Sequence, residues 1–329
     1  MRIKDIAKLA GVSPATVSRV MNNNGYVKED KRKAVLEVIE AVDYQPNEIA
    51  KSLKSQKSRM IGVIVPKIST ETASRVVAGV THVAKTAGYQ VLIANTNLDI
   101  EEEIKYLKFL SNKSVDGIIM MGTEVTDRHL EVMNKLTIPI VILGQKVSGY
   151  TSIIHNDYDA SYQMTEYLIN QGHKAIGFIG VDEKDYAVGV LRKKGYLDCL
   201  SDYNLNGSDG LIAIGDFDID TGFKMMKKIL AKSQPTAVFA VTDHLAIGAI
   251  HALLDQGYRV PEDISVVGIG DIKLAEYLNP PLTTMHYTFK TSGQMAAEAV
   301  FDLIENNAHK GEQLMTSFQL KERRSVKHL

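Results

Sequence analysis

From Met60 onward, short apolar runs of strand length alternate with longer stretches of helical pattern, and this alternation constrains the fold more than any other feature of the 329-residue chain. Continuous apolar runs of this kind are typical of parallel strands that are covered on both faces. Strand, helix and strand, repeated many times, predict a doubly wound α/β body. The predicted strands are 61–65, 91–94, 117–121, 138–143, 152–154, 175–181, 236–241 and 264–269.

The number of predicted strands indicates more than one sheet. A typical sheet has about five or six strands, and the body is predicted to contain more than that. We therefore expect two lobes, each with its own sheet. The helices expected between the strands are 73–87, 101–111, 160–171 and 244–256.

The N-terminal part of the chain has the pattern of three short helices. Apolar residues recur at helical spacing over 3–10, and Gly11 ends this stretch. Ser13 is a good N-cap, and Pro14 fits the first position of a second helix. A third apolar stripe runs along 30–42. Two short helices joined by Gly-Val-Ser-Pro and completed by a third predict an all-α helix-turn-helix domain.

This N-terminal part is basic, whereas the body is acidic. Residues 1–58 contain 11 Lys and Arg against 7 Asp and Glu, and the remaining residues contain 27 against 32. A small basic domain on an acidic body favours a polyanionic partner for the basic domain. Because the second helix of a helix-turn-helix lies in the major groove of DNA, the charge pattern agrees with DNA binding.

The second helix leaves a polar face for such a groove. Its apolar residues Val17, Val20 and Met21 turn inward, so the residues left on the outer face are Ala15, Thr16, Ser18, Arg19 and Asn22. Arg19 can donate two hydrogen bonds to guanine, and the small Ala15 suits a thymine methyl. The donors expected to contact phosphates are Ser13, Thr16, Ser18 and Asn22, and Pro14 between them is also expected at the DNA interface. The alternative is an ordinary three-helix cap whose polar side chains face solvent.

Three motifs here resemble the DNA-binding head of the lactose-repressor/galactose-repressor (LacI/GalR) family. They are KDIAKLAGVS at 4–13, TVSRV at 16–20 followed by Asn22, and Tyr-x-Pro-Asn-x-x-Ala-x-x-Leu at 44–53. The resemblance implies a helix-turn-helix domain over 1–45, and a hinge helix and linker over 46–59. The chain departs from the family at two N-cap positions, Arg2 and Lys28, and a lost cap costs about 0.5–2 kcal/mol.

In this family the hinge helices of a dimer enter the minor groove of DNA and insert a leucine pair. The resemblance assigns that wedge to Leu53, with Asn47 and Ala50 on the same face. A spacing of three residues does place Ala50 and Leu53 on one helical face, and an apolar wedge kinks the duplex. The alternative is that Ile49, Ala50 and Leu53 pack on the helix-turn-helix domain.

The body resembles the family's core, which is similar to type I periplasmic sugar-binding proteins. The resemblance implies two Rossmann-like lobes around a cleft, with three crossings of the chain between them. The effector-binding and dimerisation core is expected over 60–329, with an N-lobe of about 60–156 plus part of 289–329 and a C-lobe of about 157–288. In open α/β sheets, ligands bind beyond the carboxyl ends of the strands.

Residues after several predicted strands match effector contacts of the family. Arg192 begins an Arg-x-x-Gly-aromatic motif, and its planar fork suits a sugar or a carboxylate. Thr242 and Asp243 follow a predicted strand, as does Asp271, whose preceding family acid is replaced here by Gly270. The alternatives are a surface arginine in a basic run for Arg192 and a helix N-cap for the Thr-Asp pair.

Three more residues match the family's cleft. Phe217 corresponds to an aromatic residue that stacks on the effector, and sugar C–H faces pack well on such rings. His155 ends a strand that crosses between lobes, and Phe289 is expected at the third crossing; a lone His is more often structural. The segment 66–72 lacks the aromatic pair of many relatives. This favours a polyol over a purine, and the residues resemble sucrose- or trehalose-type operon repressors more than purine ones.

No motif points to an enzyme or to a bound cofactor. The sequence has no Gly-x-Gly-x-x-Gly after a strand, no Walker A loop, no His-Glu-x-x-His and no Gly-x-Ser-x-Gly. The nine His residues lack metal-ligand spacing, so no metal is expected. One cysteine, Cys199, and the lack of a visible signal or apolar span predict a cytoplasmic protein that does not contact the membrane.

These features predict a homodimeric transcriptional repressor of a carbohydrate-utilisation operon. It is expected to bind palindromic operator DNA and to respond allosterically to a small sugar or sugar phosphate in the inter-lobe cleft. The C-terminal sequence has no leucine-heptad tail, so a dimer is expected and not a tetramer. The alternative is a catabolite-control regulator whose corepressor is a phosphorylated carrier protein.

Overall fold

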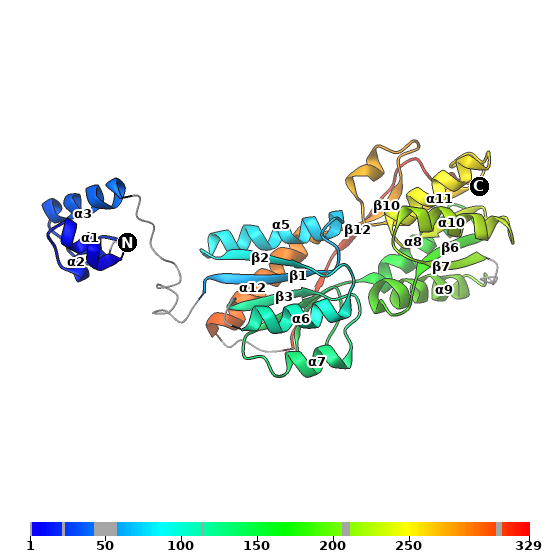
Figure 1. Ribbon diagram of the computed structural model, residues 1–329. Coiled ribbons are helices and arrows are strands. Elements are labelled where there is room, and N and C mark those ends of the chain that lie inside the picture. The colour runs from blue at the N-terminus through cyan, green and yellow to red at the C-terminus, as the bar shows by residue number, and fades with distance from the viewer. Residues whose placement is uncertain (1, 22–23, 43–57, 113–114, 206–210, 307–310) are drawn as a thin grey trace. The chain divides into compact units, whose positions relative to one another are not determined.

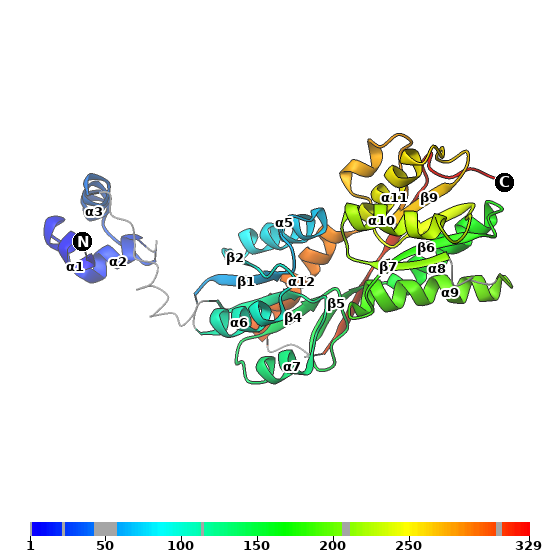
Figure 2. The ribbon, with the colours of Figure 1, turned by 45° about the vertical axis from the view of Figure 1, so that its right-hand side comes forward.

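A computed structural model of the chain describes residues 2–21, 24–42, 58–112, 115–205, 211–306 and 311–329. The chain divides into two compact units, Met1–Ser58 and Arg59–Leu329, and Figures 1 and 2 show its ribbon from two directions. The expected hinge segment 46–59 lies almost wholly outside the described residues, so a helix there stays a prediction.

The described residues of the first unit form three helices, as the apolar pattern predicts. They are α1 (Ile3–Leu9), α2 (Pro14–Met21) and α3 (Glu29–Ala41). The core between them consists of Ile6, Ala7, Val17, Val20 and Val35. Ser13 caps α2 as predicted, because its Oγ accepts a hydrogen bond from the Thr16 N–H at 3.2 Å.

The two unusual N-cap positions are compensated by acidic neighbours. The Asp5 carboxylate accepts from the backbone N–H of Arg2 at 2.8 Å, which is half of a capping box. Lys28 provides no side-chain cap for α3, but Glu29 and Asp30 lie in the first turn. Their negative charges are favourable near the positive end of the helix dipole, so both helices begin where the pattern predicts.

The second unit contains two six-stranded sheets with the orders β11-β5-β4-β3-β1-β2 and β12-β10-β9-β8-β6-β7. This confirms the doubly wound α/β body with two lobes. All paired strands are parallel except β12, which is antiparallel to β10. The first sheet comprises β1 (Met60–Val65), β2 (Gln90–Asn95), β3 (Gly117–Met121), β4 (Ile140–Leu143), β5 (Thr151–His155) and β11 (Gln313–Thr316), and the second β6 (Ile176–Val181), β7 (Ile212–Gly215), β8 (Ala237–Ala240), β9 (Ser265–Ile269), β10 (Thr283–Tyr287) and β12 (Phe318–Lys321).

Helices cover each sheet, and we call each sheet with its helices a lobe. Figure 1 shows α5 and α6 on opposite faces of the first sheet, with α7 beside α6. The N-lobe helices are α5 (Glu71–Thr86), α6 (Ile100–Ser111), α7 (Asp127–Met133) and α12 (Phe289–Asn306). The C-lobe helices are α8 (Asp157–Asn170), the π-helix η1 (Tyr186–Leu191), α9 (Arg192–Asp202), α10 (Ile219–Leu230), α11 (Asp243–Asp255) and the 3₁₀ turn η3 (Lys273–Glu276). None of the described helices is both long and apolar enough to span a membrane.

Sequence analysis missed four strands, and three of them lie at sheet edges. β7, β11 and β12 have four residues each and are only partly buried. β11 and β12 mix apolar and polar residues, so neither carries an apolar run of strand length. β7 does carry one, Ile-Ala-Ile after Leu211, and sequence analysis overlooked it. β10 lies inside its sheet but reads Thr-Thr-Met-His-Tyr. Its polar side chains find hydrogen-bond partners that the sequence does not reveal.

The chain crosses between the lobes three times, as the family resemblance implies. The first crossing joins β5 to α8, the second joins β10 to α12, and the third joins β11 to β12. All three crossings lie side by side between the two sheets in Figures 1 and 2. Phe289 begins α12 and so follows the second crossing, not the third as predicted, because the third crossing is formed by the C-terminal strands β11 and β12.

Two glycines let α5 and α12 pack backbone to backbone in the N-lobe. A Cβ at Gly79 would lie 2.0 Å from the carbonyl oxygen of Lys290, and one at Gly293 would lie 2.1 Å from that of Val76. Neither neighbour is the movable end of a side chain. Both positions thus require glycine for close approach, since a larger residue forces the two helices apart.

Replacing Gly79 with valine should therefore destabilise the N-lobe. We expect Gly79→Val to lower the free energy of unfolding by about 2 kcal/mol or more, because forced overpacking outweighs the helix propensity gained on removing glycine. Chemical denaturation measures the change. His82→Val is the matched control, since it places the same side chain on the exposed face of α5; equal losses from the two substitutions would contradict the packing argument.

Candidate functional site

The first candidate site is the outer face of α2. Ser13, Pro14, Ala15 and Arg19 are exposed, and Thr16 and Ser18 are half-buried. Val17 and Val20 are buried against the other helices as predicted. The structure therefore gathers these six predicted DNA contacts on one short helix and its cap.

Four other predicted DNA contacts cannot be placed. Asn22, Asn47, Ala50 and Leu53 lie outside the described residues. Their proposed contacts with the operator stay predictions. The described part of the head thus supports the major-groove half of the expected interface.

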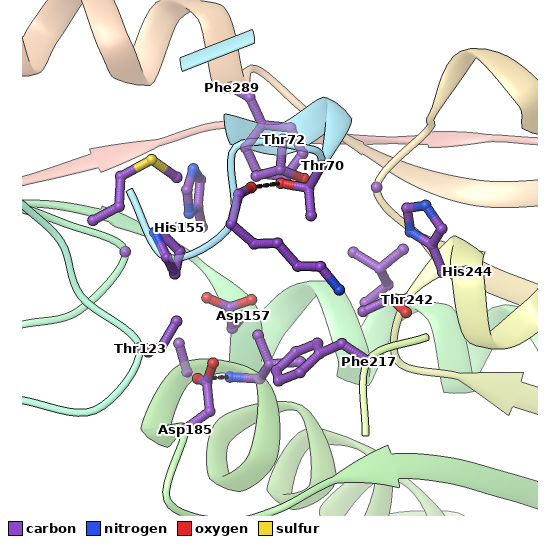
Figure 3. Close-up of a pocket in the computed structure, with 18 of the residues that line it drawn as sticks. Thr70, Thr72, Thr123, His155, Asp157, Asp185, Phe217, Thr242, His244 and Phe289 are labelled. Atoms are coloured by element: carbon purple, nitrogen blue, oxygen red, sulfur yellow. Dashed lines mark hydrogen bonds between the residues drawn. The ribbon is translucent and has the colours of Figure 1, made fainter. Parts of the chain in front are cut away.

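The second candidate site is a cavity of about 220 Å³ between the lobes (Figure 3). It lies beyond the carboxyl ends of strands in both sheets, where ligands bind in open α/β folds. Its N-lobe wall is formed by Pro66, Lys67, Thr70, Thr72, Leu98, Met121, Gly122, Thr123, Leu143, Gly144, His155 and Phe289. The C-lobe wall is formed by Asp157, Asp185, Ala187, Val188, Arg192, Phe217, Thr242, Asp243, His244, Ile269, Gly270 and Ile272.

An ion pair between Arg192 and Asp157 lies in the wall of this cavity. The Arg192 Nε donates to Asp157 Oδ1 at 2.7 Å, and its Nη2 lies 2.7 Å from the same oxygen. Its Nη1 donates to the backbone carbonyl of Val241. Both side chains are buried, with exposed fractions of 7% and 2%. The prediction of a buried arginine in the cleft is therefore correct in position, and its surface alternative is excluded.

Asp157 was missed by sequence analysis. It is the first residue of α8 and accepts a further hydrogen bond from the Tyr287 hydroxyl at 3.1 Å. The Arg192 guanidinium also lies over the Tyr287 ring, 5.3 Å from its centre. Burial and the nearby Asp157 carboxylate raise the pKa of Tyr287 well above its ordinary value. Tyr287 therefore stays a neutral donor and joins the second crossing to the first.

His155 occupies the predicted position at the first crossing. Its Nε2 lies 3.0 Å from the Ser292 Oγ, and its ring contacts those of Tyr287 and Phe289, each at 5.1 Å between centres. Burial lowers the pKa of His155 to about 4, so the imidazole is neutral at pH 7. A neutral ring packed among aromatic residues fits a wall that a sugar could contact, and it fits a structural role equally well.

Thr242 and Asp243 have separate roles at the start of α11. The Thr242 Oγ1 caps the helix by accepting from the Leu245 N–H at 3.3 Å. The Asp243 carboxylate accepts from the Ile272 N–H at 2.9 Å and from the Thr284 hydroxyl at 2.5 Å. Burial raises the pKa of Asp243 to about 6. Both residues line the cavity, but the Asp243 oxygens already have partners within the C-lobe.

Asp271 is placed differently from the expectation. It is not among the residues that line the cavity. Its carboxylate accepts from Arg323 Nη2 at 2.6 Å and lies 2.9 Å from His286 Nδ1. The sequence motif identified the end of the strand correctly, but the side chain is directed to an arginine far away in the sequence. The structure therefore does not support Asp271 as a direct ligand contact.

Asp185 is a cavity residue that sequence analysis missed. It precedes η1, and its Oδ1 accepts from the Val188 N–H at 2.9 Å. Burial raises the pKa of Asp185 to about 6. In Figure 3 it lies below Asp157 and faces the same space as Phe217. The available signal was its place in the loop between β6 and η1, because ligands bind beyond the carboxyl ends of such strands.

The cavity offers aromatic surface and hydroxyl groups together. Phe217 is half-buried and Phe289 is almost fully buried. Figure 3 shows Thr70 and Thr72 beside Phe289, with Thr242 and His244 at the right of the cavity. Lys67, Thr123 and the carboxylates complete a lining that can donate and accept hydrogen bonds around a small polar molecule. Across the described ranges, no group of His, Cys, Asp and Glu could hold a metal ion.

Two protein families match this chain, one in the N-terminal unit and one in the body. The description "bacterial regulatory proteins, lacI family" matches residues 2–47, and "periplasmic binding protein-like domain" matches residues 165–326. The first match covers the three-helix unit, and the second covers most of the C-lobe and the later crossings.

Individual relatives align along nearly the whole chain. The sucrose operon repressor of Staphylococcus xylosus is 36% identical over 305 residues, covering 92% of this chain and 94% of the relative. The transcriptional repressor PurR of Vibrio atlanticus is 35% identical over 331 residues, covering 99% of each. The lac repressor dimer bound to operator and the anti-inducer ONPF is 27% identical, with a TM-score of 0.91 over 99% of each chain. These relatives are transcriptional repressors and not enzymes, and the chain belongs to the LacI family of bacterial transcription regulators.

Proposed function

We propose that this protein is a homodimeric repressor of a carbohydrate-utilisation operon, controlled by a small sugar or sugar phosphate in the inter-lobe cavity. Two helix-turn-helix units of a dimer read the halves of a palindromic operator. Since this target is chromosomal DNA, the proposed site of action is the cytoplasm. The similarity to a sucrose operon repressor and to a lac repressor dimer on its operator supports this function.

The observation that carries the proposal is that the cavity wall and the lobe crossings share residues. His155 and Asp157 flank the first crossing, and Phe289 follows the second. A ligand that contacts these side chains has different contacts in open and closed arrangements of the lobes. Because a ligand shifts an equilibrium only through its differential affinity for two states, this placement gives it the means to do so.

The lining favours a polyhydroxy ligand over a planar base. The segment that follows β1 contributes Pro66, Lys67, Thr70 and Thr72 to the cavity lining, and none of these has an aromatic ring. The carboxylate of Asp185 and the guanidinium of Arg192 can hydrogen-bond to hydroxyl groups, while Phe217 supplies one apolar face. A planar purine base is the competing ligand class, and it would require more aromatic surface than this lining supplies.

Within this proposal, ligand closure changes the separation of the two hinge segments in the dimer. The proposal takes the predicted hinge helices to be too short to form unless they pack together in DNA, so a change in their separation would control operator affinity. The ligand lowers that affinity as an inducer or raises it as a corepressor by the same route. A phosphorylated carrier protein as corepressor is the alternative, and binding of that carrier to the ligand-free protein would distinguish it.

We expect Arg19→Ala to weaken operator binding by about 1–3 kcal/mol and to relax the base preference at one position of each half-site. The reason is the loss of a bidentate contact with guanine. Binding is measured on an operator selected from random duplexes, at fixed salt. Lys33→Ala is the control, because Lys33 is an exposed cation on α3; a loss of the same size there, with unchanged base preference in both variants, would refute the assigned role of Arg19.

A panel of ligands tests the effector class. Sucrose, trehalose, their phosphates and purine bases are compared by thermal unfolding, where a ligand at 100 times its Kd adds about 2.7 kcal/mol. We expect a sugar to stabilise the protein and Phe217→Ala to weaken that sugar about tenfold, or about 1.4 kcal/mol, through lost stacking. Stabilisation by purine bases alone would overturn the sugar assignment.

The affinity for the sugar should fall as the pH is lowered through 6. The pKa of Asp185 is about 6, and a sugar hydroxyl donates best to its ionised carboxylate. Sugar binding therefore lowers this pKa, and protonation competes with binding by up to about tenfold per pH unit below it. Titration calorimetry from pH 5 to pH 8 measures the effect. Asp185→Asn keeps the acceptor for Val188 and should flatten the profile; an unchanged slope in this variant would exclude Asp185 as the titrating contact.

A further inference from the structure

The start of α5 contacts the C-lobe directly, outside the cavity. The Arg75 Nη2 donates to the backbone carbonyl of Asp271 at 2.8 Å, and its Nη1 lies 3.5 Å from that of Gly270. The Glu71 Oε2 accepts from the Lys273 N–H at 2.8 Å. Figures 1 and 2 show this end of α5 beside the C-lobe. One helix of the N-lobe therefore holds one turn of the C-lobe through side chain to backbone hydrogen bonds.

Glu71 and Arg75 are also joined to each other. Their side chains lie one helical turn apart, and Arg75 Nη2 is 2.5 Å from Glu71 Oε1. The ion pair therefore holds both side chains in position to contact the C-lobe, Glu71 as a hydrogen-bond acceptor and Arg75 as a donor. Its exposed fractions are only 32% for Glu71 and 26% for Arg75, so water screens these contacts less than it screens a surface ion pair.

The turn of the C-lobe that Glu71 and Arg75 contact, residues 270–273, is held in place by several interactions. Gly270 has φ +140° and Asp271 has φ +49°, and non-glycine residues rarely adopt the latter conformation. The Asp271 carboxylate is held by Arg323 and His286. His286 belongs to β10, which leads into the second crossing, and Arg323 follows β12, which completes the third. The contact across the cleft therefore ends on a turn anchored to two of the three crossings.

The same turn forms part of the cavity wall. Gly270 and Ile272 line the cavity from the C-lobe, and Thr70 and Thr72 line it from the N-lobe, on either side of Glu71. Residues 70–75 of the N-lobe and 270–273 of the C-lobe thus supply both cavity lining and the contact between α5 and the turn. When the lobes separate there, the cavity opens and the hydrogen bonds of Glu71 and Arg75 break together.

We propose that Glu71 and Arg75 form a clasp that holds the lobes closed in the absence of any effector and so sets how much closed protein is available to bind one. Loss of the clasp lowers the closed fraction, and apparent affinity falls in proportion to that fraction. A tenfold smaller closed fraction thus means about tenfold weaker binding. This proposal rests on the proposed function, in which closure of the lobes controls ligand binding. It names Glu71 and Arg75 as the positioning residues for closure, whichever ligand binds.

The test measures the inter-lobe distance in the full-length, ligand-free protein. Spin labels on cysteines at two exposed positions, Lys105 in the N-lobe and Lys224 in the C-lobe, report this distance by pulsed electron resonance. We expect Arg75→Ala and Glu71→Ala to shift the distribution to longer distances or to add a longer population. Glu71→Gln keeps an acceptor for the Lys273 N–H and should give a smaller shift.

Arg128→Ala is the matched control. Arg128 pairs with Glu101 on neighbouring helices of the same lobe, so its loss removes an arginine–glutamate pair without crossing the cleft. Thermal unfolding checks that all variants are folded. An unchanged distribution in Arg75→Ala and Glu71→Ala would overturn the proposal, and so would an equal shift in Arg128→Ala. Because no effector or DNA is present, the failure of a sugar to bind would not alter this result.

Discussion

The buried ion pair between Arg192 and Asp157 is the interaction on which the rest of the body depends. Two charges have been removed from water, and removing either partner would leave the other unpaired at a cost of about 3–5 kcal/mol. Asp157 begins α8 just after the first crossing, and Tyr287 ends β10 just before the second. The pair with its tyrosine therefore fixes two crossings to each other and forms the cavity wall in the same place.

The cavity wall and the connection between the lobes share residues. His155, Tyr287 and Phe289 form an aromatic cluster at the crossings, and two of them line the cavity. Glu71 and Arg75 contact a turn whose Asp271 carboxylate is held by Arg323 and His286. In the proposed function, a molecule bound in the cavity acts on the arrangement of the lobes through these shared residues.

The strands buried on both faces were predictable from sequence, because a continuous apolar run has few other uses in a chain of this composition. β6 and β8 are examples, since all their residues are buried. The edge strands β11 and β12 gave no such signal, because they mix apolar and polar residues, whereas the apolar run of β7 was present in the sequence and overlooked. In the head, Val17 and Val20 fall on the buried face by simple helical periodicity, so the exposed residues of α2 followed directly.

The site shows where such reasoning fails. Asp157 and Asp185 both line the cavity. In the sequence each lies near other acidic residues, and their spacing does not show which carboxylate is buried in the folded protein. Asp271 carries a family motif, but its partner Arg323 is brought close only by the C-terminal strand pairing. A motif locates the end of a strand; it does not decide between the neighbours that compete for a charged side chain there.

Local periodicity of apolar residues was enough to predict the two units, the buried strands of the body and the outer face of α2. It did not reveal which charges are paired, which carboxylates are buried or which contacts cross the cleft. Those outcomes depend on residues far apart in the chain that meet at the three crossings, where the loss of water makes the choice of partner energetically decisive.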